Sequence, residues 1–216
     1  MIYFIGDSYA ANNLREAARR RGLKMAESIE QADLVFVSQD TPTGADGTRN
    51  LEPIRALIDS AKSKAIVITS QVQPGFTRSL KRFDVYHQAE TLRAGDGLQR
   101  AMYPEMFIVG SGLKSMPIHS DYLAYLAAFD CPVFFMSYEE AEFAKIAINM
   151  TLASQVDNTN RLTAAAEKLG CSWQKISQVL RHDSRIGKYS YLTPGDWRKS
   201  PHLLRDEVTL KEIEAK

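Results

Sequence analysis

The sequence predicts an α/β fold in which a doubly wound, mostly parallel sheet precedes a long connecting helix and a small all-α region. Over residues 1–137, short apolar segments alternate with segments of helical periodicity, which is typical of a parallel sheet with helices on its faces. Over residues 138–169 the chain contains neither Gly nor Pro, which predicts one long helix. We therefore expect an α/β domain at 1–137 and a helical domain at 138–216.

The strands of the sheet are expected at short segments rich in apolar and β-branched residues. They are residues 2–6, 32–38, 64–70, 83–87, 106–111 and 132–137. Two of them, ADLVFVS and KAIVITS, are apolar almost throughout, as strands are when a parallel sheet buries both of their faces.

Helices are expected between these strands at 12–22, 50–62 and 120–129. The first begins at Asn12 and ends at Gly22, two residue types that commonly cap helices. The second carries Pro53 in its first turn, where a helix tolerates proline.

The long helix is expected to span residues 138–170, and a shorter helix follows at 173–182 with Ser172 as its N-cap. The long helix is apolar on more than one side, so it should pack against more than its own domain. A homodimer formed through residues 138–170 is the simplest explanation of this pattern.

Composition excludes several classes of protein. A net charge of +1 and the lack of basic stretches interleaved with aromatics argue against a nucleic-acid partner. The one basic cluster, LREAARRRGLK (14–24), has helical spacing and is either a solvated helix face or a phosphate contact. No segment is apolar enough to span a membrane, no signal peptide precedes the first strand, and Cys131 and Cys171 lack metal-ligand spacing. We expect a cytoplasmic protein without a metal site.

The turn after the first strand, GDSYAA, resembles an altered dinucleotide-binding turn of a Rossmann-like domain. Gly6, Ser8 and Ala11 stand at the three glycine positions of the pattern G-x-G-x-x-G, which brings backbone N–H groups close to a pyrophosphate. Ser8 weakens the match because its Cβ occupies the path of the phosphate, and Asp7 adds a negative charge there. The ribose-binding carboxylate is expected at Glu27. The domain either binds NAD or NADP or keeps its shape without the ligand.

Lys145 and Asn149 are four residues apart and share one face of the long helix. A cation and an amide that project together from the apolar stretch FAKIAINM could stabilise an alkoxide or an oxyanion. Alternatively, Lys145 extends to the surface and Asn149 bonds a neighbouring helix.

The chain resembles the UDP-glucose/GDP-mannose dehydrogenases over most of residues 32–206. Five stretches follow the order, and nearly the spacing, of that family: ADLVFVSQDTPT (32–43), ITSQVQPGFTR (68–78), YHQAETLRAGDGLQRAMYPEMFIVGS (86–111), AEFAKIAINMTLASQVDNTNRLTAAAEKLG (141–170) and DSRIGKYSYLTPG (183–195). The resemblance implies a shortened form that has the family's nucleotide-binding and central dimerisation domains and lacks its C-terminal UDP-binding domain.

The resemblance also implies roles for individual residues. These enzymes oxidise the C6 alcohol group of a sugar to a carboxylate with NAD, through intermediates bound to a cysteine. Glu90 matches a glutamate that handles water, Gln71 stands where a threonine serves that water, and Lys145 and Asn149 match the pair that stabilises the oxyanion. The remaining matches lie in the loop that lines the cofactor site and in the substrate-binding stretches: Thr41, Pro42 and Thr43 for the cofactor, and Leu92, Arg93 and Arg185 for the sugar nucleotide.

The stretch TPGDWRKSPHLLRD (193–206) aligns with the family's catalytic loop. His202 falls on the nucleophilic cysteine, Arg205 on a substrate-binding lysine and Asp206 on a catalytic aspartate. Without a thiolate no thioester can form, so the second oxidation lacks its covalent intermediate. His202 could act as a general base, or it is simply an exposed loop residue. Likewise Glu90 is either a buried base or a loop carboxylate that faces Arg93.

Three functions remain open from the sequence. The first is an NAD(P)-dependent oxidoreductase that acts on an alcohol or carbonyl of a sugar nucleotide, with an altered or lost second oxidation. The second is a non-catalytic homologue that acts as a dimerising partner or regulator. The third is a reductase of the β-hydroxyacid dehydrogenase kind, which also uses a Lys-x-x-x-Asn pair but would need an intact glycine turn.

Overall fold

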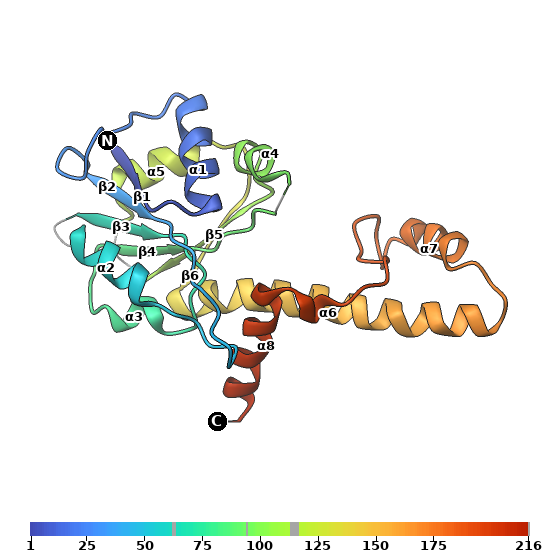
Figure 1. The fold of residues 1–216 in the computed structure, drawn as a ribbon. Helices are drawn as coiled ribbons and strands as arrows, with labels where there is room; N and C mark the ends of the chain where they lie inside the picture. The colour runs from blue at the N-terminus through green and yellow to red at the C-terminus, as the bar shows by residue number, and fades with distance from the viewer. Residues whose placement is uncertain (62–63, 94, 113–116, 216) are drawn as a thin grey trace. The chain divides into compact units, whose positions relative to one another are not determined.

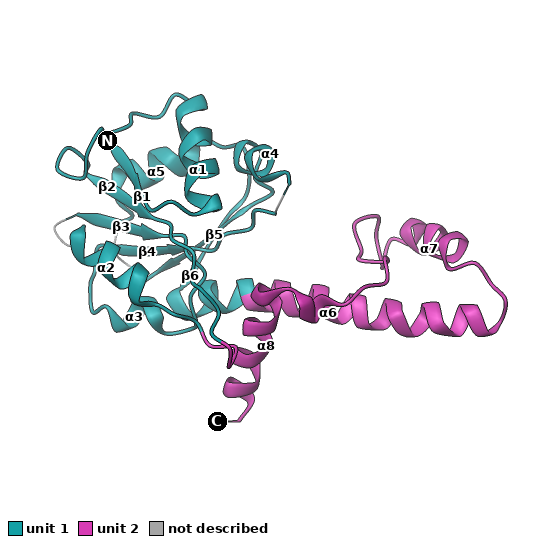
Figure 2. Ribbon diagram, in the orientation of Figure 1, with its two compact units in different colours: residues 1–44, 49–145 teal, residues 45–48, 146–216 magenta. Residues whose placement is uncertain are grey.

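The chain divides into two compact units in a computed structural model, which describes residues 1–61, 64–93, 95–112 and 117–215 (Figure 1). The first unit contains residues 1–44 and 49–145, and the second contains residues 45–48 and 146–216 (Figure 2). The boundary at residue 145 falls inside the long helix.

The first unit is built on a sheet whose described strands follow the chain in order. They are β1 (Ile2–Ile5), β2 (Leu34–Val37), β3 (Ala65–Ile68), β4 (Val85–Gln88), β5 (Phe107–Ser111) and β6 (Val133–Ser137). Neighbouring strands are parallel except β4 and β5, which are antiparallel. Together with the long helix that follows, this sheet confirms the predicted fold class.

Helices cover both faces of the sheet (Figure 1). One face packs against α1 (Tyr9–Arg20), α4 (Gly97–Met102) and α5 (Ser120–Ala127). The other face packs against α2 (Glu52–Ser60), α3 (Phe76–Ser79) and Tyr138 at the start of α6. The two helices α3 and α4 were not predicted, because neither is long enough to show a helical period.

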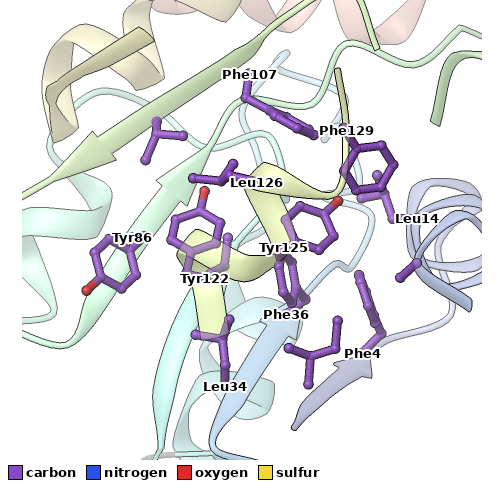
Figure 3. Close-up of a cluster of buried hydrophobic side chains, with 14 of the residues drawn as sticks. Phe4, Leu14, Leu34, Phe36, Tyr86, Phe107, Tyr122, Tyr125, Leu126 and Phe129 are labelled. Atoms are coloured by element: carbon purple, nitrogen blue, oxygen red, sulfur yellow. The ribbon is translucent and has the colours of Figure 1, made fainter. Parts of the chain in front are cut away.

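Aromatic side chains fill the core on the α1 and α5 face (Figure 3). Phe4 of β1 stacks on Phe36 of β2 with ring centroids 4.5 Å apart, and Tyr125 of α5 lies 4.5 Å from Phe36. Aromatic pairs of this kind contribute beyond the area that they bury. The cluster therefore fixes α5 over the first two strands.

The predicted helix at 12–22 begins earlier than expected. The N-cap is Ser8, whose hydroxyl accepts a hydrogen bond from the Ala11 N–H at 3.0 Å, and Asn12 lies inside the helix. A serine hydroxyl at this position satisfies an N–H that has no partner within the helix, which explains the earlier start. The predicted helix at 50–62 ends at Ser60, and its residue 62 lies outside the described residues.

The second unit is helical. It comprises most of α6 (Tyr138–Lys168), then α7 (Trp173–His182), a short 3-10 turn η1 (Trp197–Lys199) and α8 (Pro201–Glu214). Residues 201–206 were expected in a loop but belong to α8. Pro201 stands in the first turn of this helix, where its missing N–H has no partner to lose, so it favours a helix start at this position.

Candidate active site

Glu90 and Lys145 come together in the first unit. Glu90 follows the carboxyl end of β4, and Lys145 lies on α6. Burial raises the pKa of Glu90, while the charge of Lys145, the Leu92 N–H and the charge of Arg100 each act to lower it. The Leu92 N–H donates a hydrogen bond to the Glu90 carboxylate. A carboxyl group whose pKa is raised in this way can exchange a proton nearer to neutral pH.

A cavity of about 20 Å³ adjoins Glu90. Its polar lining is Thr69, Gln88, Glu90, Thr91 and Arg100, and the rest is apolar. This volume and this number of polar groups suit one water molecule. The cavity therefore places a water-sized space beside a carboxyl group that can accept or donate a proton.

Arg93 does not determine the charge around Glu90. Arg93 is exposed and forms an ion pair with Asp96, whereas the cations that lower the pKa of Glu90 are Lys145 and Arg100. The role of Glu90 as a buried base stays a prediction. Leu92, between them, packs against the core of the α1 and α5 face.

Gln71 and Thr41 join the loops that follow β3 and β2. The Thr41 hydroxyl donates to the Gln71 carbonyl oxygen at 3.2 Å, and Thr41 is buried. Thr43 forms an isolated bridge with Arg49, and Pro42 between them is exposed. The Thr41 hydroxyl and the bridge at Thr43 thus help to hold this loop in place.

Glu142 is a site residue that the sequence did not reveal. Its buried carboxylate accepts hydrogen bonds from the Gly75 N–H at 2.6 Å and the Thr77 N–H at 2.8 Å, and burial raises its pKa. Glu142 precedes Lys145 by one turn of α6, so it anchors that turn to the loop after Gln71. The only sequence signal is one acidic residue in the apolar stretch AEFA.

In the second unit, Asn149 and Asp206 form a buried pair. The Asn149 Nδ2 donates to the Asp206 Oδ2 at 2.6 Å, and the two residues are 8% and 0% exposed. Arg205, beside Asp206, is also buried. A buried carboxylate needs such donors because its desolvation is costly. Asp206 lies on α8, so this contact is a hydrogen bond from Asn149 to a neighbouring helix, as one of the two expectations for Asn149 stated.

The other predicted residues of the second unit lie at the surface. His202 is exposed on the first turn of α8, and Arg185 is exposed and pairs with Asp183 at 2.7 Å. The role of His202 as a general base stays a prediction.

The three positions of the altered glycine turn lie between β1 and α1. Gly6 has a positive φ of 105°, which favours glycine, Ser8 is the N-cap and Ala11 is fully buried in α1. Glu27, the expected ribose ligand, is exposed and follows an isolated bridge rather than a full strand.

Two absences hold for the described part of the chain. None of its helices is long and apolar enough to cross a bilayer. Nor do three or more His, Cys, Asp or Glu side chains there gather as a metal would require.

Comparisons with known proteins agree with this architecture. Residues 139–197 match the model of the UDP-glucose/GDP-mannose dehydrogenase family, central domain. A UDP-glucose 6-dehydrogenase of Campylobacter jejuni is 29% identical over 175 residues, which are 76% of this chain and 44% of that protein. One from Glycine max is 27% identical over 74% of this chain and 38% of its own length. The chain thus spans less than half of the length of these curated relatives.

Solved structures show the same fold. A UDP-glucose dehydrogenase from Pyrobaculum islandicum aligns with a TM-score of 0.78 at 22% identity, over 99% of this chain and 63% of that one. A GDP-mannose dehydrogenase from Pseudomonas aeruginosa aligns with a TM-score of 0.64 at 19% identity, over 96% and 55%. By sequence, the chain is therefore related to the UDP-glucose/GDP-mannose dehydrogenases, and residues 139–197 match the model of that family's central domain. The solved structures show that the chain shares their fold.

Proposed function

We propose that this chain is a homodimer-forming homologue of the nucleotide-sugar dehydrogenases that does not carry out their oxidation to an acid. The observation that carries the proposal is the partly exposed apolar face of α7. Trp173, Ile176, Val179 and Leu180 follow the spacing of one helix face. Ile176 and Val179 are exposed, Trp173 and Leu180 are half-buried, and α7 contains no buried residue.

Further apolar side chains are exposed near the ends of α7. Leu169 is 78% exposed and Tyr189 is 81% exposed, and Ile186 and Tyr191 are exposed as well. Apolar surface that is gathered on one element commonly marks a protein interface. A second copy of the chain is the partner we propose, because the long helix α6 adds a face of small and polar residues that lets another helix approach closely. That face is Ala147, Met150, Thr151, Ser154, Gln155 and Asn158.

The proposal that the oxidation to an acid is lost depends on His202. A thioester requires a thiolate, and the position that resembles the family's nucleophile holds an exposed imidazole. The free cysteines, Cys131 and Cys171, lie elsewhere in the sequence, on either side of α6.

Sedimentation equilibrium tests the dimer. The wild type should have twice the mass of the 24.2 kDa chain, and Val179→Asp should weaken self-association by at least about tenfold, because it places a charge in the apolar face. The neighbouring exposed residue supplies the matched control, since Gln178→Asp adds the same charge outside that face. A monomeric wild type, or equal effects of the two variants, would reject the proposed interface.

One observation favours a second candidate function. The charge of Lys145 acts on Glu90, and Glu90 lines a water-sized cavity. These two features suit an oxidoreductase acting on an alcohol or carbonyl of a sugar nucleotide, in a single two-electron step. In that function Glu90 moves the proton, and Lys145 stabilises the developing oxyanion. This candidate requires a nicotinamide cofactor, and it fails if the protein forms no reduced cofactor from any sugar nucleotide offered.

A further inference from the structure

The outer edge of β1 lacks the second strand on which a dinucleotide-binding unit places its ribose carboxylate. Residues 21–33, all of which are described, contain no helix or strand. On this outer edge, Met25 is the only described residue that bridges to β1, through one isolated bridge to Ile2. The Ile2 N–H donates to the Lys24 carbonyl oxygen at 3.0 Å, and the Ala26 N–H donates to the Ile2 carbonyl oxygen at 2.8 Å.

Arg15 forms hydrogen bonds with carbonyl groups beyond Ile2 on this edge. Its Nη2 donates to the carbonyl oxygens of Phe4 and Gly6, each at 3.1 Å. Carbonyls of alternate residues in a strand point to the same edge, so those of Ile2 and Phe4 in β1 both face away from β2. The Arg15 guanidinium therefore binds the carbonyls that a neighbouring strand would otherwise pair, and it covers an edge that is open to association with other strands.

The crevice between the ends of β1 and β2 is closed by Ser8 and Ser38. The Ser8 hydroxyl donates to the Ser38 carbonyl oxygen at 3.0 Å and lies 3.1 Å from the Ser38 hydroxyl. The Ser8 hydroxyl oxygen also accepts a hydrogen bond from the Ala11 N–H, so this amide is not directed at a ligand. A Cβ at Gly6 would lie 2.1 Å from the Ser38 carbonyl oxygen, which shows how closely the two turns approach. A pyrophosphate would need this space and the N–H groups of the turn.

The charges around the crevice also oppose a diphosphate. Asp7 follows β1 and Asp40 follows β2, and both are exposed at this end of the sheet. Two carboxylates would repel the negative charges of a pyrophosphate placed between these turns. The Asp40 carboxylate accepts the Thr41 N–H at 2.9 Å, so it caps its own turn.

We infer that the turn from β1 into α1 stabilises the domain without a ligand and excludes NAD and NADP, although the fold resembles that of enzymes that use NAD. Ser8 closes the crevice and Arg15 replaces the missing strand pairing, so two residues that the glycine pattern does not contain stabilise the domain without a cofactor. This inference does not depend on the proposed dimer, whose test measures mass and not ligand binding. It is an alternative to the oxidoreductase candidate, which requires NAD or NADP.

Calorimetric titration of the full chain with NADH and with NADPH tests the exclusion. The family relative from Campylobacter jejuni serves as the positive control. We expect no saturable binding up to about 1 mM, the upper end of ordinary substrate constants. Saturable NADH binding that NAD displaces would overturn the inference.

The thermal unfolding midpoint, Tm, of a Ser8 variant tests whether Ser8 stabilises the domain. Ser8→Ala removes the cap and both contacts with Ser38, so it should lower Tm by about 3 °C or more. Ser172→Ala is the matched control, because Ser172 is the N-cap of α7 and its side chain makes no capping bond. An unchanged Tm for Ser8→Ala, or equal shifts for the two variants, would contradict the assigned role of Ser8.

Discussion

His87 shows how one buried residue links this fold to pH. It lies on β4, is 2% exposed, and its Nδ1 has no hydrogen-bond partner among the described residues. Burial lowers the pKa of His87 to about 4. The unfolded chain, in which a histidine has a pKa near 6.5, therefore takes up this proton first as the pH falls. The stability that His87 contributes is complete above about pH 6.5 and is lost toward pH 4.

Replacement of His87 should flatten this pH dependence. Between pH 7 and pH 5 the free energy of unfolding of the wild type should fall by about 2 kcal/mol more than that of His87→Gln. Urea titrations at the two pH values measure the difference, and His182→Gln, at an exposed histidine, is the control. Parallel pH profiles for the wild type and His87→Gln would contradict the assignment.

At the residue scale, sequence reasoning found side chains with a recognisable pattern and missed those that bind backbone. Lys145 and Glu90 were singled out by helix spacing and by resemblance, and the structure brings them together. Arg15 and Glu142 gave no such signal, because their partners are carbonyl and N–H groups from distant turns. Tertiary contacts with the backbone leave no periodic trace in a sequence.

Among the elements, β5 and the first turn of α6 approach each other most closely at Gly110. A Cβ there would lie 2.9 Å from the Ala141 Cβ, 3.1 Å from the Tyr138 Cα and 3.2 Å from the Ser137 carbonyl oxygen. Two of these atoms belong to the backbone, so they cannot move aside as the end of a side chain can. The absence of a side chain at Gly110 is thus what allows α6 to pack on this strand.

Gly110→Ala should therefore lower the free energy of unfolding by about 1–3 kcal/mol, as overpacking does in a well-packed core. Gly195→Ala is the matched control, because a Cβ at Gly195 would meet no atom within 4 Å, and its effect should stay within about 0.5 kcal/mol. Urea unfolding of both variants gives the comparison. Equal stabilities would mean that α6 does not pack on β5 in this way.

The elements themselves were largely predictable, whereas their pairing was not. Apolar segments gave β2 and β3, and the lack of Gly and Pro gave α6. Periodicity could not give the short helices α3 and α4, nor α8 within an expected loop. The antiparallel pairing of β4 with β5 depends on the path of residues 89–106, and no local pattern specifies such a path.

At the scale of the whole molecule, the chain shares the fold of solved nucleotide-sugar dehydrogenases. The α/β unit has a mostly parallel sheet with helices on both faces, and the helical unit contains a buried Asn149–Asp206 pair. A fold does not fix an activity, because activity resides in particular side chains. The side chains on which our proposals about activity depend are Ser8 and Asp40 after β1 and β2 and His202 on α8.

The production of NADH tests most directly the claim that this chain does not oxidise sugar nucleotides. The chain would be incubated with NAD and, in turn, UDP-glucose and GDP-mannose, and the absorbance of NADH would be followed beside the Campylobacter jejuni relative. Our account predicts no NADH above a protein-free blank. NADH formation by the wild type that Lys145→Ala abolishes, and that Lys175→Ala on the exposed surface of α7 retains, would contradict it.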